Sequence, residues 1–217
     1  MLNLPQSTEV RRPLPKAGLY KRFDWKPSQR ECFDGDVSRL DFVNWIAPRT
    51  LPAIAEGTEV KEIYVVEVAL KNRDFDIKNI TLLAKSIPQH IVYLLRYGDE
   101  AQLAVYYTRL FLTPWQHAEG MSLQLNGLNL DNVWENIVRD IAQLPPVGTS
   151  LCDVSDAGDK SQIQDATGIS LQEQIADNEQ RAKLERQIAT LERQMFATRQ
   201  PRRKRELFEQ LQKLKQK

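Results

Sequence analysis

The most regular pattern in the chain is the run of residues 62–70 (EIYVVEVAL), in which apolar side chains occupy both faces of an extended segment. Such a run is typical of a central strand that is covered on two sides by other parts of the protein. Glu67 is the exception, because a carboxylate among aliphatic side chains must find a partner, reach the edge of the sheet or titrate abnormally. One face of this strand is predicted to carry Tyr64, Val66, Val68 and Leu70, and the other Ile63, Val65, Glu67 and Ala69.

Three further segments are rich in β-branched and aromatic residues and predict strands at 91–97, 101–108 and 121–125. The first two are separated by a Gly-Asp-Glu turn, which predicts a hairpin. The third is followed by Leu128 beyond Gly127.

Apolar residues three and four positions apart predict amphipathic helices at 37–46, 77–86 and 131–143. The first would follow the turn pair Asp34-Gly35 and end before Pro48, and the last would begin at Asp131 as its N-cap. On the first helix the core-facing side chains would be Leu40, Phe42, Val43 and Trp45. Local strand pairing combined with helices predicts an α+β domain over residues 1–143, with a mixed or antiparallel sheet and packed helices.

The composition changes after this domain. Proline, glycine, serine and aspartate dominate residues 144–169, which predicts a flexible linker. Residues 170–217 are rich in strong helix formers and predict a helical hairpin. Ser170 and Glu173 have the spacing of a capping box at its start, and Pro201 fits the first position of a second helix.

Both predicted tail helices carry a narrow apolar line, which we call the seam. Its spacing of four, three and four residues in the first helix is that of a coiled coil. Isolated helices of this length are marginal in water, so the seam must pack on itself, on a second copy of the chain or on another protein. Ion pairs between Asp177 and Arg181 and between Glu179 and Lys183 would support the first helix. The predicted partner-binding residues are Leu184, Ile188, Leu191 and Met195 in the first helix and Leu207, Leu211 and Leu214 in the second.

A cluster of cations lies at the predicted turn of the hairpin. These residues are Arg199, Arg202, Arg203, Lys204 and Arg205, with no acidic residue among them. They could contact phosphate groups of a nucleic acid, or they could form a solvated turn. No aromatic residue interleaves the cluster, which favours the solvated turn.

Charge is distributed unevenly along the chain. The 217 residues include 30 Lys and Arg against 29 Asp and Glu, with a formal net charge of +1. Residues 170–217 hold 12 basic and 7 acidic groups, which leaves residues 1–169 with a net charge of −4. A share of 41% hydrophobic residues excludes a wholly disordered chain. The prolines and charges of the first residues are unlike a secretory signal, and no run is long enough to span a membrane, so we expect a cytoplasmic protein.

Sequence motifs of the common enzyme classes are absent. There is no phosphate-binding loop, dinucleotide fingerprint or paired C-x-x-C, and the two cysteines and two histidines lack ligand spacing, so no metal site and no cofactor are expected. One catalytic hypothesis survives, a Mg²⁺-dependent nuclease built on Glu67 and Lys71 with Asp41 and Asp74 as partners. Its match is loose, because such sites place the lysine two residues after the acid, where this chain has Ala69.

Extended segments of the chain resemble a bacterial family of unknown function, domain family 4391. The resemblance covers almost the whole chain and rests on LNLPQSTEV, LPKAGLY, EIYVVEVALK, IPQHIVYLL, DEAQLAVYYT, GLNLDNVWENIV, LQEQIADNEQRAKLERQIATLERQ and QPRRKRELFEQLQKL. It transfers no active site, because it includes no catalytic motif. It implies an accessory protein encoded beside helicases and type III restriction-modification methyltransferases, with a role in DNA modification, restriction or phage defence.

Three hypotheses follow for the function. The leading one is a non-catalytic subunit that docks onto a helicase or DNA methyltransferase through the tail, with its basic turn near DNA. The second is the Mg²⁺-dependent nuclease built around Glu67. The third is a structural protein that forms homo-oligomers through the tail.

Overall fold

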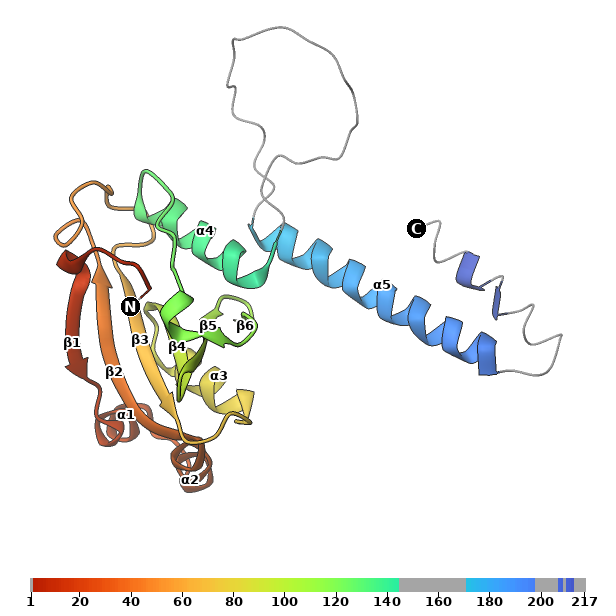
Figure 1. Cartoon of the computed structure of the whole chain (residues 1–217), viewed down its shortest axis with the longest axis horizontal. Coiled ribbons are helices and arrows are strands. Elements are labelled where there is room, and N and C mark those ends of the chain that lie inside the picture. Colours follow the sequence, from red (N-terminus) through yellow and green to blue (C-terminus); the bar gives the residue numbers. More distant parts are fainter. Residues whose placement is uncertain (1, 145–170, 198–206, 209, 213–217) are drawn as a thin grey trace, which may run out of the picture. The chain divides into compact units, whose positions relative to one another are not determined.

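The computed structural model of the chain describes residues 2–144, 171–197, 207–208 and 210–212. The chain divides into two compact units, residues 1–145 and 146–217, which we call the head and the tail. The head is an α+β structure with a mixed sheet and packed helices, and the described part of the tail is helical (Figure 1). The predicted fold class is therefore confirmed.

The sheet of the head has seven strands within the described residues. β3 and β4 are parallel, and every other pair of neighbours is antiparallel. A parallel pair needs a crossover connection, and helix α3 supplies it between β3 and β4. The strands follow one another across the sheet as β1 (Glu9–Pro13), β2 (Val37–Ile46), β3 (Ile63–Leu70), β4 (His90–Tyr97), β5 (Glu100–Tyr106) and β6 (Leu110–Leu112), and β7 (Gln116–His117) pairs with β5.

Among the residues that the structure describes, four complete α-helices belong to the head and one to the tail. They are α1 (Lys16–Phe23), α2 (Pro27–Asp36), α3 (Ile77–Ser86), α4 (Leu130–Ala142) and, in the tail, α5 (Leu171–Ala197). Two short 3₁₀ turns lie at Gln6–Thr8 and Ala118–Gly120.

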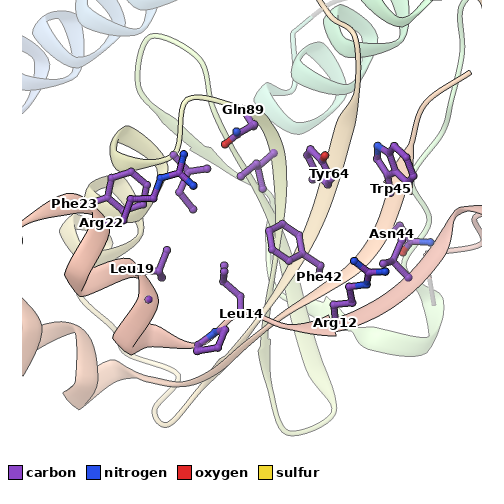
Figure 2. A pocket seen from close by; sticks show the side chains of 15 residues that line it. Arg12, Leu14, Leu19, Arg22, Phe23, Phe42, Asn44, Trp45, Tyr64 and Gln89 are labelled. Carbon is purple, nitrogen blue, oxygen red and sulfur yellow. The ribbon is translucent and has the colours of Figure 1, made fainter. Parts of the chain in front are cut away.

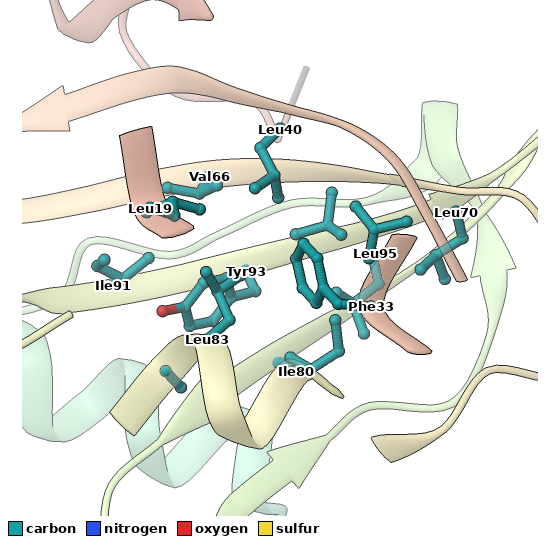
Figure 3. Packing of buried hydrophobic residues seen from close by; sticks show 14 of the residues in the cluster. Leu19, Phe33, Leu40, Val66, Leu70, Ile80, Leu83, Ile91, Tyr93 and Leu95 are labelled. Atoms are coloured by element: carbon teal, nitrogen blue, oxygen red, sulfur yellow. The ribbon is translucent and has the colours of Figure 1, made fainter. Parts of the chain in front are cut away.

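Helices α1, α2 and α3 cover one face of the sheet and build a core there. In Figure 3, Phe33 of α2 and Ile80 and Leu83 of α3 lie against strand residues such as Val66 and Leu95. Phe33 is fully buried and makes an edge-on contact with the ring of Trp25, with ring centroids 5.0 Å apart. On the opposite face of β3, Val65 and Ile63 are also fully buried, so β3 is covered on two sides as predicted.

The prediction of a helix at 37–46 is wrong, because these residues form strand β2. The register of β2 against β3 shifts twice, between Val37 and Arg39 and between Phe42 and Asn44. Each β-bulge inserts one extra residue and reverses the alternation of the faces. Buried positions therefore fall at Val37, Leu40, Asn44 and Ile46, a spacing that resembles a helix.

The prediction of a strand at 121–125 is also wrong. Met121 and Leu123 are buried, as the alternation suggested, but the segment joins no strand of the sheet. Its backbone is held instead by a hydrogen bond of 3.0 Å from the Leu123 N–H to the Leu2 carbonyl. Alternation thus identified the buried side chains but not the partner of the backbone.

Several other predicted elements are confirmed, with changes at their ends. β3, α3 and the β4–β5 hairpin lie close to their predicted bounds, and Gly98 takes a left-handed conformation (φ 58°) at the hairpin turn. The helix predicted at 131–143 is α4, but its N-cap is Asn129, whose side chain accepts the Asn132 N–H at 2.9 Å. Asp131 has another role, described below. The sequence analysis did not predict α1, α2, β1, β6 or β7.

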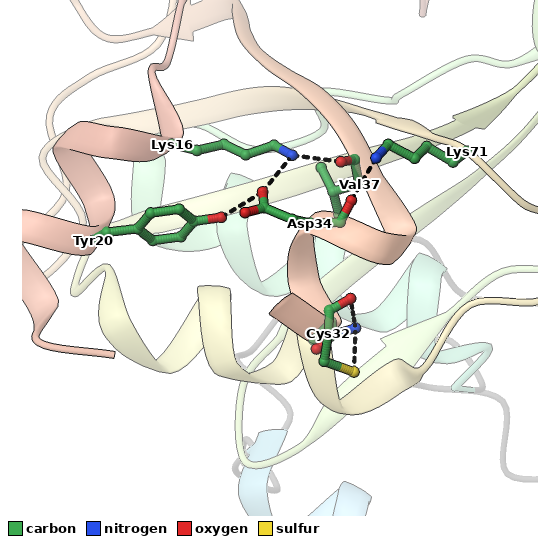
Figure 4. A network of polar contacts seen from close by, with 7 residues as sticks. Lys16, Tyr20, Cys32, Asp34, Val37 and Lys71 are labelled. Atoms are coloured by element: carbon green, nitrogen blue, oxygen red, sulfur yellow. Dashed lines mark hydrogen bonds and ion pairs between the residues drawn. The ribbon is translucent and has the colours of Figure 1, made fainter. Parts of the chain in front are cut away.

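A polar network joins α1 and α2 to the ends of two strands (Figure 4). The carboxylate of Asp34 accepts hydrogen bonds from Lys16 Nζ at 2.8 Å and from the Tyr20 hydroxyl at 2.7 Å. Burial alone would raise the pKa of Asp34, but these two bonds and the charges of Lys16 and Lys71 together outweigh it and lower the pKa. Lys71, which follows β3, donates to the Asp34 carbonyl at 2.6 Å.

The tail contains the predicted first helix as α5. Arg181 and Asp177 form the predicted ion pair, at 3.0 Å. Residues 207–208 and 210–212 are also helical, in the region of the predicted second helix. The predicted linker beyond Leu144, the basic turn and Leu214 lie outside the described residues.

Candidate functional site

Three places in the molecule are candidates for function: a polar pocket at Glu67, an aromatic pocket beside α1, and the seam of the tail. The polar pocket has a volume of about 480 Å³ and is lined by the first residues of the chain, β1, β2, Glu67 and Arg96. Asp41 of β2 and Glu67 of β3 face each other as partners in the antiparallel register. The structure therefore brings together two of the four residues predicted for a nuclease.

Arginines accompany both of these carboxylates. Arg96 of β4 forms an ion pair with Glu67 at 3.8 Å between Nη1 and Oε1, and Arg39 forms one with Asp41 at 2.5 Å between Nε and Oδ2. The side chain of Glu67 is 11% exposed and that of Asp41 is 21% exposed, so each carboxylate needs a cation beside it. The atom Asp41 Oδ2 is itself buried, and its ion pair with Arg39 does not have the geometry of a hydrogen bond.

The other two predicted nuclease residues lie elsewhere. Lys71 donates to the Asp34 carbonyl, and Asp74 is exposed in the turn between β3 and α3. Neither residue lines the polar pocket. Within the described residues, no group of three or more His, Cys, Asp and Glu side chains is arranged to hold a metal ion.

The aromatic pocket was not predicted. It has a volume of about 650 Å³ and lies between β1, α1, β2, the start of β3 and the segment 87–91 (Figure 2). Its aromatic residues are Phe23, Phe42, Trp45 and Tyr64, and its charged residues are Arg12 and Arg22. These residues come from four different elements, so no local pattern in the sequence marks the pocket.

Glu62 acts on two of these rings. Its carboxylate accepts the indole N–H of Trp45 at 3.0 Å. Burial raises the pKa of Tyr64 to about 12, and the carboxylate of Glu62 adds to this effect. Tyr64 is therefore a neutral hydrogen-bond donor at physiological pH.

The seam residues of α5 are half-buried, whereas most of the other described side chains of this helix are exposed. Leu184, Ile188, Leu191 and Met195 share this intermediate exposure. Two residues nearer the start of the helix, Leu171 and Ile175, are almost fully buried, at 3% and 4% exposure. In the second helical region Leu211 is 5% exposed and Leu207 is half-buried.

His90, at the start of β4, packs on Trp134 of α4 with their ring centroids 4.9 Å apart. Burial lowers its pKa, although the carboxylates of Asp131 and Glu59 act in the opposite direction. His117 is exposed on β7. Among the helices that the structure describes, none combines the length and apolarity of a membrane span.

The mixed sheet, its helices and the helical tail define a two-part α+β protein, and both pockets described above lie in the head. The chain belongs to the family DUF4391, a domain of unknown function, whose sequence model matches residues 2–217. No curated protein and no solved structure matches the chain.

Proposed function

We propose that this protein is a non-catalytic accessory subunit that docks onto a helicase or DNA methyltransferase through the seam of its tail. The observation that carries the proposal is the line of half-buried apolar side chains on α5, at the four-three-four spacing of a coiled coil. A helix of this kind gains most of its stability from packing its apolar line against another surface. The choice of partner follows from the resemblance of the chain to accessory proteins encoded beside such enzymes.

Co-purification with the neighbouring helicase and methyltransferase tests this proposal. The seam variant carries the three changes Leu184→Glu, Ile188→Glu and Leu191→Glu, because a carboxylate cannot enter an apolar interface without a partner. We expect association with the neighbours to be lost.

The control variant carries Gln180→Glu, Gln187→Glu and Ala189→Glu, all at exposed positions of the same helix. It adds the same number of carboxylates to α5 and should associate as the unmodified chain does. Equal association of both variants, or equal loss, would refute docking through the seam. A complex that contains only copies of this chain would support the homo-oligomeric alternative, and light scattering measures its mass.

A second candidate function, the Mg²⁺-dependent nuclease, is supported by the placement of Asp41 opposite Glu67 beside an open polar pocket. Asp41 Oδ2 could coordinate a cation if the metal replaced Arg39, which lies 2.5 Å away. Arg39 and Arg96 oppose this function, because each already neutralises one of the two carboxylates.

The nuclease candidate predicts that the purified chain cleaves DNA or RNA when Mg²⁺ or Mn²⁺ is added, and that Glu67→Gln or Asp41→Asn abolishes cleavage. Asp74→Asn is the control, because Asp74 does not line the polar pocket. Absence of cleavage with single-stranded and double-stranded substrates, alone and with the neighbouring enzymes, would remove this candidate.

A further inference from the structure

The aromatic pocket is an opening in the layer of helices that covers one face of the sheet. Its lining combines aliphatic side chains such as Leu14, Leu19 and Ile91 with aromatic rings. A volume of about 650 Å³ is within the range of ligand sites, and most of the lining is apolar. The pocket can therefore take a flat apolar group of moderate size.

The aromatic rings are positioned by contacts within the head. Phe42 and Tyr64, on neighbouring strands, meet edge-on with their ring centroids 5.6 Å apart. Trp45 donates its indole N–H to Glu62, which does not line the pocket itself. Because the rings are held before any ligand arrives, little conformational entropy would be lost when a planar group stacks on them.

The charged residues that line the pocket are all cations. Its lining includes Arg12 and Arg22 and no Asp or Glu. Both arginines are exposed, and Arg22 lies over the ring of Phe23 at 5.6 Å. Figure 2 shows the two arginines on opposite sides of the pocket, with Phe42 between them.

This arrangement matches one class of ligand better than others. A fatty acid or a mononucleotide carries its negative charge at one end and would leave one arginine without a partner. A nucleotide within a single strand has a phosphate on each side of its base, and its base can stack because it is not paired. Bases inside a duplex are not accessible for stacking on a protein ring.

We propose that the aromatic pocket binds a base of single-stranded nucleic acid, with the two flanking phosphates held by Arg12 and Arg22. The aromatic rings supply stacking that tolerates any base, and the arginines supply the salt-dependent part of the affinity. This site is separate from the basic turn at residues 199–205 and does not depend on docking through the seam.

Fluorescence anisotropy with a labelled oligothymidylate of about 15 nucleotides tests the proposal at about 50 mM salt. The full-length chain is used in a background with Arg199, Arg202, Arg203, Lys204 and Arg205 changed to Gln, so that the basic turn does not contribute. We expect this protein to bind the single strand and to bind a duplex of the same length much more weakly.

Variants assign the binding to the pocket. Arg12→Ala and Arg22→Ala should each weaken binding and make the slope of log K against log salt concentration less steep by about 0.7. Trp45→Ala or Tyr64→Ala should weaken binding about tenfold at any salt concentration, because one stacked base is lost. Lys21→Ala and Arg49→Ala remove exposed cations outside the pocket and should leave the affinity unchanged.

An abasic oligonucleotide of the same length provides the remaining comparison, because it keeps the phosphates and lacks the bases. It should bind less tightly than oligothymidylate. No binding of the single strand, equal binding of the duplex or abasic strand, or equal losses in the pocket and control variants would each overturn the proposal. Circular dichroism of each variant verifies that the fold is retained. The seam variant should bind the single strand as the unmodified chain does, because the pocket does not depend on docking through the seam.

Discussion

Asp131 illustrates at the scale of one residue how a loop is fixed to a helix. It lies in the first turn of α4, and its carboxylate accepts the backbone N–H groups of Thr58 at 2.6 Å, Glu59 at 3.1 Å and Val60 at 2.7 Å. The N–H of Val60 is the main cause of the lowered pKa of Asp131. Gly57 must remain a glycine here, since an added Cβ would lie 2.7 Å from the backbone carbonyl oxygen of Val60 as well as 2.3 Å from Asp131 Oδ1.

We predict that Asp131→Ala lowers the free energy of unfolding by about 1 to 2 kcal/mol, because three N–H groups lose a charged acceptor. The value is low for three such bonds because Asp131 is partly exposed to water. Urea unfolding at neutral pH measures it, with Glu135→Gln on the exposed face of the same helix as the control. A loss no larger than that of the control would contradict the prediction.

The contribution of Asp131 should also depend on pH. Its pKa is lower in the folded than in the unfolded chain, so its stabilisation is complete above the unfolded value of 3.8. Stabilisation then falls as the pH drops through the folded pKa. The difference in stability between the unmodified chain and Asp131→Ala should therefore shrink below pH 3.8, and a constant difference would show that the charge is not involved.

At the scale of elements, α2 is attached to the sheet through one large side chain. Phe33 is fully buried, contacts Trp25 and belongs to the core between the helices and the sheet. Asp36 and Asn79 add a polar connection from α2 to α3, with 2.7 Å between Oδ2 and Nδ2. The attachment of α2 should therefore depend on both apolar burial and this hydrogen bond.

Replacement of Phe33 by Ala should cost about 3 to 5 kcal/mol, through lost burial and the cavity left behind. Phe208→Ala is the matched control, because Phe208 is 49% exposed in the tail and its loss should cost little. Both values come from urea unfolding, which is monitored by tryptophan fluorescence for Phe33→Ala and by circular dichroism for Phe208→Ala. A cost near 1 kcal/mol for Phe33→Ala would mean that the core collapses into the space.

At the scale of the whole molecule, the chain consists of two compact units, each with contacts among its own residues. All four tryptophans, at positions 25, 45, 115 and 134, belong to the head. Tryptophan fluorescence therefore reports on the head alone, whereas the seam lies in the tail.

We predict that the seam variant unfolds in the head at the same urea concentration as the unmodified chain, although it loses its binding partner. The physical reason is that the core of the head is built from residues before 145. Tryptophan fluorescence of both proteins measures the two midpoints. A large decrease in the midpoint would show that the seam stabilises the head and is not a separate docking surface.

Some parts of the fold could be predicted from the sequence because their burial follows one unbroken period. β3 alternates without a bulge, and α4 repeats its apolar residues at helical spacing, so both were found. β2 was misread because two bulges change its period. The need of Glu67 for a partner was also predicted, but Arg96 could not be identified, since it lies on a strand brought alongside by the crossover through α3.

The sequence by itself determined which segments are apolar on one face, where the helical tail begins and that Glu67 requires compensation, because these follow from local periodicity and chemistry. Tertiary structure alone decided that Lys71 binds Asp34 instead of joining Glu67, and that Arg12, Arg22, Phe42 and Tyr64 surround one pocket. Contacts of this kind depend on which strands pair and on where a helix leaves the sheet uncovered. Strand pairing and helix position depend on the packing of the whole head, so they cannot be derived from any single segment of the sequence.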